Sequence, residues 1–155
     1  MQGMNTLHLM VGLPCSGKTT YARQLAEETN AMLLTRDAWH LELFGDDVGD
    51  EQHRERHNRL EAMLWDIAKH VLEIGGDVIL DFGCWTRAER DTYKARANEL
   101  GVNVRLHYMD APAAELHRRL ELRNRNPDKS TFFIPATELD KVIPMFQPPT
   151  EDEFQ

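Results

Sequence analysis

The sequence has few cysteines and no long apolar run. Cys15 and Cys84 are the only cysteines among 155 residues. Their spacing fits neither a metal-binding motif nor a disulfide framework. No stretch approaches the ~20 apolar residues that a membrane-spanning helix needs, and Met1–Leu9 lacks the features of a secretory signal. We therefore expect reduced thiols, no membrane partner and a cytoplasmic location.

Positive charge is also scarce. The chain has 18 Lys and Arg residues against 26 Asp and Glu residues, which gives a formal net charge of −8. A protein that holds nucleic acid by its phosphates usually presents a basic surface. The balance therefore argues against a nucleic-acid partner without excluding a local basic patch. Composition, with 41% hydrophobic and 28% charged residues, is typical of one globular domain spanning residues 1–155.

Short apolar runs alternate with longer amphipathic segments, which is the pattern of an α/β domain with a parallel sheet. The expected strands are Leu7–Val11, Met32–Leu34, Val78–Leu80 and Val104–Tyr108. The expected helices are Lys18–Glu28, Ala38–Phe44, His53–Glu73, residues 86–100, residues 112–123 and Ala136–Val142. A capping box at Thr86–Glu89 opens the fourth helix and Gly101 ends it. No clear fifth strand follows Arg125, and a polar turn is expected at Asn126–Lys129.

The most specific motif is a phosphate loop. Residues 12–19, GLPCSGKT, match G-x-x-x-x-G-K-[ST] between an expected strand and an expected helix. Glycines let the loop turn its N–H groups inward around a phosphate, Lys18 reaches the β- and γ-oxygens, and the Thr19 hydroxyl ligates Mg²⁺. We expect ATP and Mg²⁺ as cofactors. The expected nucleotide contacts in the loop are Gly12, Pro14, Cys15, Ser16, Gly17, Lys18, Thr19 and Thr20.

Other motifs follow the loop in a recognisable order. Thr35-Arg36-Asp37 follows the second strand, Asp81 follows the third, and arginines lie between Arg118 and Arg125. Together these features resemble the small P-loop kinases of the AAA-type ATP-binding group, which includes chloramphenicol phosphotransferase, the kinase domain of polynucleotide kinase and the zeta toxins. The resemblance covers residues 7–125. It implies a three-layer α/β/α P-loop NTPase fold of the nucleoside-monophosphate-kinase type, with a lid over about residues 118–135 and a C-terminal tail over about residues 143–155.

Two aspartates are candidates for the chemistry. Asp37 lies just past a strand's carboxyl end, where ligands bind in open parallel sheets, and could take the proton of an incoming hydroxyl. The alternative is that Asp37 is only the N-cap of Ala38–Phe44. Asp81 resembles the acidic position that holds Mg²⁺ through water. The alternatives for Asp81 are a substrate contact, a turn residue, or the base in place of Asp37.

Arginines of the lid are expected to contact ATP. Arg119 and Arg123 are four residues apart and share one helix face. Guanidinium groups stabilise the charge that spreads over the γ-oxygens during phosphoryl transfer. The alternative is a basic helix end that faces only solvent and the helix dipole. Arg118 is expected to point elsewhere.

The acceptor side is expected near the two aspartates. Asp37, Trp39, His40 and Trp85 are the candidate substrate residues, since aromatic and polar groups together suit a ring-bearing or sugar-like acceptor. His53 and His57 have a spacing that could bind metal, but HRERH lacks the glutamate of the zinc-protease motif, so zinc is not expected. The acidic loop at residues 46–51 could attract a cationic acceptor, and residues 146–149 could lie against the adenine.

These features predict an ATP-dependent kinase that phosphorylates a hydroxyl of a small molecule such as a metabolite, nucleoside or antibiotic. One alternative is a polynucleotide 5′-hydroxyl kinase, which predicts a basic channel. Another is an ATP-binding switch acting through a protein partner, for which Lys18 is essential and Asp37 dispensable. The sequence leaves the acceptor and the oligomeric state open.

Overall fold

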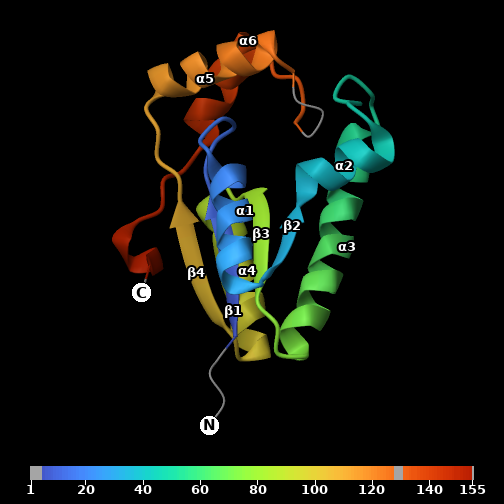
Figure 1. Cartoon of the computed structure of the whole chain (residues 1–155), viewed down its shortest axis with the longest axis vertical. Helices are drawn as coiled ribbons and strands as arrows, with labels where there is room; N and C mark the ends of the chain where they lie inside the picture. Colours follow the sequence, from blue (N-terminus) through green and yellow to red (C-terminus); the bar gives the residue numbers. More distant parts are fainter. Residues whose placement is uncertain (1–4, 128–130, 155) are drawn as a thin grey trace.

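The fold is a four-stranded parallel sheet between two layers of helices (Figure 1). The computed structural model describes residues 5–127 and 131–154. The strands are β1 (Thr6–Val11), β2 (Met32–Thr35), β3 (Val78–Gly83) and β4 (Asn103–Tyr108), in the order β2-β3-β1-β4. All three pairings are parallel. The expected four-strand parallel sheet and three-layer fold class are confirmed.

Helices cover both faces of the sheet. They are α1 (Lys18–Thr29), α2 (Arg36–Phe44), α3 (His53–Glu73), α4 (Arg87–Leu100), α5 (Ala113–Arg125) and α6 (Ala136–Val142), followed by the 3-10 turns η1 (Ile143–Met145) and η2 (Glu151–Phe154). The first helix, α1, packs on one face, and α3 and α4 pack on the other. No helix among residues 5–127 and 131–154 is long and apolar enough to cross a membrane.

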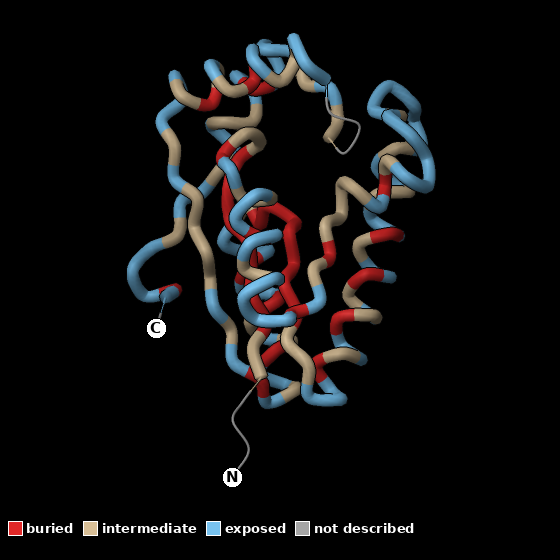
Figure 2. Tube along the Cα trace, in the orientation of Figure 1, coloured by how far each residue is buried: buried red, intermediate tan, exposed pale blue. Residues whose placement is uncertain are grey.

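Alternation along the strands assigns side chains to these two layers. Val78, Leu80 and Phe82 of β3 join the buried cluster beneath α3 and α4, whereas Ile79 joins the cluster beneath α1. Figure 2 shows the resulting core as a buried band along the central strands. Because successive strand residues point to opposite faces, Asp81 lies on the α1 face, as Ile79 does. The pleat therefore directs this carboxylate toward the start of α1.

The helices α5 and α6 lie above the carboxyl ends of the strands (Figure 1). Leu116, Leu120 and Leu139 of these helices pack against Leu13 of the phosphate loop. This cluster fixes α5 beside the loop. The expected lid, residues 118–135, includes residues outside the described part of the chain.

The C-terminal tail packs beside strand β4. The Phe146 ring stacks on Tyr108 with centroids 5.8 Å apart, and the N–H of Gln147 donates to the Trp85 carbonyl at 2.8 Å. Residues 146–149 therefore pack beside the end of β4 and lie outside the cleft described below. The expected contact of these residues with the adenine stays a prediction, and the packing of Phe146 on Tyr108 fixes where this segment lies.

Two element boundaries change the predicted roles of site residues. Strand β3 continues to Gly83 because β2 pairs with it as far as Asp81 and β1 pairs with it as far as Gly83, so Asp81 lies within the strand. Helix α2 begins at Arg36, which places Asp37 in its first turn. The alternative of Asp37 as an N-cap is wrong, since Thr35 occupies that position. The Thr86 capping box is confirmed, with its hydroxyl accepting from the Glu89 N–H.

Candidate active site

The phosphate loop has the backbone shape that an anion needs. Cys15 and Gly17 have φ values of 68° and 91°, in the left-handed region. Alternating backbone handedness turns successive N–H groups toward one concavity, and the N-terminus of α1 adds its positive dipole end. A Cβ at Gly12 would lie 2.5 Å from the Ser16 hydroxyl oxygen, so any larger residue there would force the Ser16 side chain to move. The loop is therefore a preformed anion cradle.

A cleft of about 310 Å³ opens beside this loop. It is lined by residues 14–20 and Arg23, by residues 35–37, by residues 81–83 and Trp85, and by Arg119, Arg123, Thr131, Phe132 and Ile134 of the expected lid segment. The lining includes five cationic side chains and two carboxylates. The chain as a whole is acidic, but this cleft is basic. A volume above roughly 300 Å³ is in the range of small-molecule sites, and the charge suits a polyphosphate.

Asp81 and Thr19 form a pair at the base of the cleft. The Thr19 hydroxyl donates to Asp81 Oδ2 at 2.7 Å, and the Thr35 hydroxyl donates to the same oxygen at 3.3 Å. Asp81 is only 4% exposed, and its Oδ1 has no hydrogen-bond partner among the described residues. A buried carboxylate oxygen usually meets a donor, water or cation. The pair therefore fits Mg²⁺, held by the Thr19 hydroxyl and by Asp81 through water.

Asp37 reaches the cleft from the side of α2. Its side chain is 49% exposed, and its Oδ1 lies 3.6 Å from His57 Nε2 on α3. The neighbouring Arg36 forms an ion pair with Glu61 and donates to the Phe82 carbonyl at 2.9 Å. These contacts hold the start of α2 against β3. Asp37 is therefore presented at the cleft on a fixed helix turn.

The two predicted lid arginines both line the cleft. Arg119 donates through Nη1 to the Cys15 carbonyl at 3.0 Å and through Nε to Glu115 at 2.9 Å. Arg123 donates to the Phe132 carbonyl at 3.1 Å. Both guanidinium groups thus stand at the phosphate loop or at the cleft wall above it.

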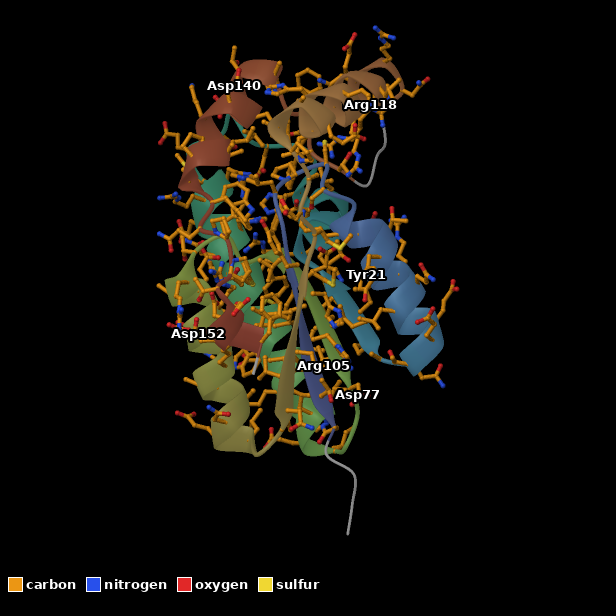
Figure 3. The ribbon with its side chains drawn as sticks, turned by 90° about the vertical axis from the view of Figure 1, so that its left-hand side faces the viewer. Tyr21, Asp77, Arg105, Arg118, Asp140 and Asp152 are labelled. Atoms are coloured by element: carbon orange, nitrogen blue, oxygen red, sulfur yellow. The ribbon has the colours of Figure 1, made fainter. Side chains whose placement is uncertain are left out.

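Arg118 behaves differently from its neighbour on α5. It pairs with Glu115 at 2.6 Å and lies on the exposed side of the helix, at the top of the molecule in Figure 3. Hydrogen bonds from Arg118 and Arg119 lower the pKa of Glu115 to about 2. The expectation that Arg118 points away from the cleft agrees with this placement.

The predicted acceptor-side residues separate into two groups. Asp37 and Trp85 line the cleft, and the Trp85 indole N–H donates to the Gly12 carbonyl at 3.1 Å. Trp39 and His40 lie outside it: Trp39 is partly exposed, and His40 is fully buried against α3. Trp39 is two positions after Asp37 and therefore lies on another face of α2. His40 is three positions after Asp37, and its ring is held against Asp47 and the His57 ring of α3.

Several lining residues were not predicted. Arg23 lies four positions after Thr19 on α1, so helical spacing could have identified it. Arg36 belongs to the Thr35-Arg36-Asp37 run, but the sequence predicted no function for its side chain. Phe132 arrives from the lid, and no local pattern signals its contact with the cleft.

The chain has clear relatives by family and by structure. Residues 7–149 match the AAA domain family. No curated protein matches the chain. A component of the Pnkp1/Rnl/Hen1 RNA repair complex superposes with a TM-score of 0.77 at 25% identity, over 94% of this chain and 45% of that one. The chain thus spans less than half the length of that protein.

Two further solved structures share the fold over most of both chains. An unliganded sugar kinase from Janibacter sp. HTCC2649 has a TM-score of 0.68 at 21% identity, covering 97% of this chain and 82% of that one. Kti12 from Chaetomium thermophilum in complex with ADP-AlF₃ has a TM-score of 0.70 at 22% identity, covering 93% and 81%. These likenesses establish the P-loop kinase type of fold.

Proposed function

The chain belongs to the AAA domain family and has the fold of the small P-loop kinases, and we propose that it transfers the γ-phosphoryl group of ATP to a hydroxyl of a small molecule. One observation carries this proposal. A single cleft contains the phosphate loop, the Thr19–Asp81 pair and the carboxylate of Asp37. The first two features suit any nucleoside triphosphatase, whereas a carboxylate facing them suits an enzyme that must deprotonate an acceptor.

The phosphate loop and the start of α1 are the proposed nucleotide-binding segments. The loop N–H groups and the helix dipole surround the β-phosphate, and Lys18 neutralises the β- and γ-oxygens. The positive φ of Cys15 and Gly17 supports this role, because that backbone shape turns donors inward. Thr20 and Arg23 extend the polar wall along α1.

Thr19 and Asp81 are the proposed holders of Mg²⁺. When bound, the ion neutralises charge on the β- and γ-phosphates. The buried Asp81 Oδ1 without a protein partner supports this assignment. The Thr19 hydroxyl already points at Asp81 Oδ2, so the pair is oriented before any ligand arrives.

Asp37 is the proposed general base. In this mechanism the acceptor oxygen attacks the γ-phosphorus, its proton passes to Asp37, and the bond to the β,γ-bridging oxygen breaks so that ADP leaves. Arg119 and Arg123 stabilise the negative charge on the transferring group. The acceptor sits toward Asp37 and Trp85, where one aromatic wall and one carboxylate suit a ring-bearing hydroxyl compound.

A polynucleotide 5′-hydroxyl end is the second candidate acceptor. Two observations favour it: five cationic side chains line the cleft, and the chain is similar to a component of an RNA repair complex. The overall charge of −8 favours the small molecule. An assay with both classes of acceptor separates the candidates.

The test incubates the purified chain with γ-labelled ATP and Mg²⁺, together with pooled metabolites, nucleosides and antibiotics, and separately with 5′-hydroxyl oligonucleotides. We expect label on one small compound. Lys18→Ala should abolish the transfer, and Asp37→Asn should slow it by at least about 100-fold while retaining ATP binding. Matched controls are Lys69→Ala on α3 and Glu42→Gln on α2, both exposed and outside the cleft.

Each outcome is informative. Label on oligonucleotides alone would replace the small molecule with a nucleic-acid end. Tight ATP binding without transfer to either class would exclude the kinase and favour a switch that acts through a protein partner. Transfer by Asp37→Asn at the wild-type rate would remove Asp37 from the role of base and direct attention to Asp81.

A further inference from the structure

Three ligand-type side chains meet outside the cleft, where α2 joins α3. His40 Nε2 on α2 lies 2.7 Å from Asp47 Oδ1 in the connecting loop. His53 Nδ1, at the first residue of α3, lies 2.5 Å from the same oxygen. The three donor atoms all lie within 4.8 Å of one another. Two imidazoles and one carboxylate therefore converge on a single point.

This cluster is largely buried, with His53 at its partly exposed edge. His40 is fully buried, and the Asp47 side chain is 8% exposed. The Phe132 ring of the lid covers the site, with its centroid 5.3 Å from that of His40 and 5.5 Å from that of His53. Polar groups in such a place are costly unless they are paired or bound to a metal. Their convergence is thus a built arrangement and differs from an exposed acidic patch.

We propose that His40, Asp47 and His53 form a binding site for a divalent transition-metal ion of the zinc class. Imidazole nitrogen with one carboxylate oxygen is a donor set that suits Zn²⁺, whereas Mg²⁺ and Ca²⁺ prefer oxygen alone. Three protein ligands leave one tetrahedral position for water. This site is separate from the Mg²⁺ position proposed at Thr19 and Asp81.

A second layer of contacts orients the ligands. Arg56 Nη1 donates to Asp47 Oδ2 at 2.9 Å, which turns Oδ1 toward the two rings. His57 Nδ1 lies 3.0 Å from His40 Nδ1, the ring nitrogen that faces away from the metal position. Such outer partners fix ring orientation in metal sites. Of the i, i+4 pair on α3, His53 is therefore a proposed metal ligand, whereas His57 is an outer partner that orients His40.

Metal binding at this cluster would also change whether His57 presents a bare nitrogen or an N–H group to Asp37. Without metal, Asp47 Oδ1 accepts from His40 Nε2–H and from His53 Nδ1–H. A neutral His40 then has no proton on Nδ1, so this nitrogen accepts from His57 Nδ1–H. The bare Nε2 of His57 then faces the carboxylate of Asp37 at 3.6 Å. With metal on His40 Nε2, the Nδ1–H of His40 donates to His57, and His57 Nε2–H faces Asp37 instead. This consequence rests on the proposed function, whereas the metal site does not.

The experiment uses the full chain with any affinity tag removed and with metal stripped by chelation. Co²⁺ is titrated in the presence of millimolar Mg²⁺ and followed by visible ligand-field absorption, and Zn²⁺ then competes. Equilibrium dialysis with elemental analysis gives the stoichiometry. We expect one equivalent of Co²⁺ per chain, displaced by Zn²⁺.

Variants decide whether this cluster is the site. His53→Gln and Asp47→Asn should each weaken binding at least about tenfold, since even outer partners of metal ligands cause losses of that size. His70→Gln, exposed on the same helix, is the matched control and should bind as the wild type does. Circular dichroism checks that each variant is folded, and the partly exposed His53 makes that variant the safer of the two.

Three results would overturn the proposal: no saturable binding, equal binding in His53→Gln and the wild type, or binding lost only in Cys15→Ser. None of them bears on phosphoryl transfer, which is measured with Mg²⁺ and ATP alone. Failure of the metal site and failure of the kinase are therefore distinguishable.

Discussion

Glu153→Gln should destabilise the protein strongly, although Glu153 does not line the cleft. Its carboxylate accepts from Arg90 Nε at 2.7 Å, and both side chains are fully buried. Arg90 also donates to the Cys84 carbonyl at 2.9 Å. The pair joins the tail around Asp152, labelled in Figure 3, to α4 and to the end of β3.

The magnitude follows from burial. The substitution leaves the Arg90 guanidinium inside the protein without a counter-charge, and removing one partner of a buried ion pair costs about 3–5 kcal/mol. Native domains are stable by only about 5–15 kcal/mol. A single amide in place of a carboxylate should therefore remove a large fraction of the free energy of unfolding.

Urea denaturation followed by circular dichroism measures this loss. Glu151→Gln, on the exposed side of the same turn, is the matched control and should change stability by less than about 0.5 kcal/mol. The double variant Arg90→Met/Glu153→Met should recover most of the loss, because apolar replacement of a buried pair is often neutral or stabilising. A Glu153→Gln protein as stable as the wild type would show that the buried Arg90–Glu153 pair does not hold the tail in place.

The same pair predicts a pH dependence. Burial alone would raise the pKa of Glu153, but hydrogen bonds from Arg90 and from the Thr150 N–H outweigh it, so the pKa lies below its ordinary 4.5. This stabilisation is complete above pH 4.5 and is lost as the pH falls through the folded-state pKa. Below pH 4.5, the free energy of unfolding of Glu153→Gln should therefore fall less steeply with decreasing pH than that of the wild type.

Three further predictions concern the site and the sheet. In the wild type, Mg²⁺ should increase the ATP affinity measured by calorimetry. In Asp81→Asn this increase should be much smaller, because the carboxylate paired with Thr19 is lost. An increase as large as in the wild type would contradict the role of Asp81. Burial raises the pKa of Cys84 to about 12, so iodoacetamide at about pH 8 should modify the partly exposed Cys15 and spare Cys84, and ATP should protect Cys15. Peptide mass spectrometry identifies the modified cysteine, and modification of Cys84 before Cys15 would contradict this prediction. Burial, together with the charges of His8 and Arg105, lowers the pKa of His107 from 6.5 to about 4. Between these pH values the unfolded chain binds more protons than the folded one, so the free energy of unfolding should fall as the pH drops from 6.5 to 4. The same pH dependence of stability in His107→Gln would contradict this.

Local patterns were sufficient to predict the phosphate loop and its flanking elements. The loop depends on glycine positions and on the apolar run before it, which are properties of adjacent residues. The four strands and the Thr86 cap followed from the same kind of signal. Asp81 was placed at the correct edge, though as a residue after the strand, because pairing with β1 and β2 extends β3 beyond its apolar core.

Contacts between distant segments could not be predicted in this way. His40 is buried because α2 docks on α3, and that docking depends on Asp47 and His53 together. Phe132 covers the histidines from a segment about ninety positions further along the chain. Phe146 packs on Tyr108 because the tail runs beside β4. Each depends on tertiary packing and leaves no periodic signal in the sequence.

The most direct test of the central claim is a rapid-quench single turnover with γ-labelled ATP and the acceptor that the screen identifies. We predict that Asp37→Asn binds ATP·Mg²⁺ as the wild type does but transfers the label about 10²–10⁴-fold more slowly, the range that loss of a general base causes, while Glu42→Gln is unchanged. Transfer by Asp37→Asn at the wild-type rate, or label appearing only in inorganic phosphate in every protein, would contradict it.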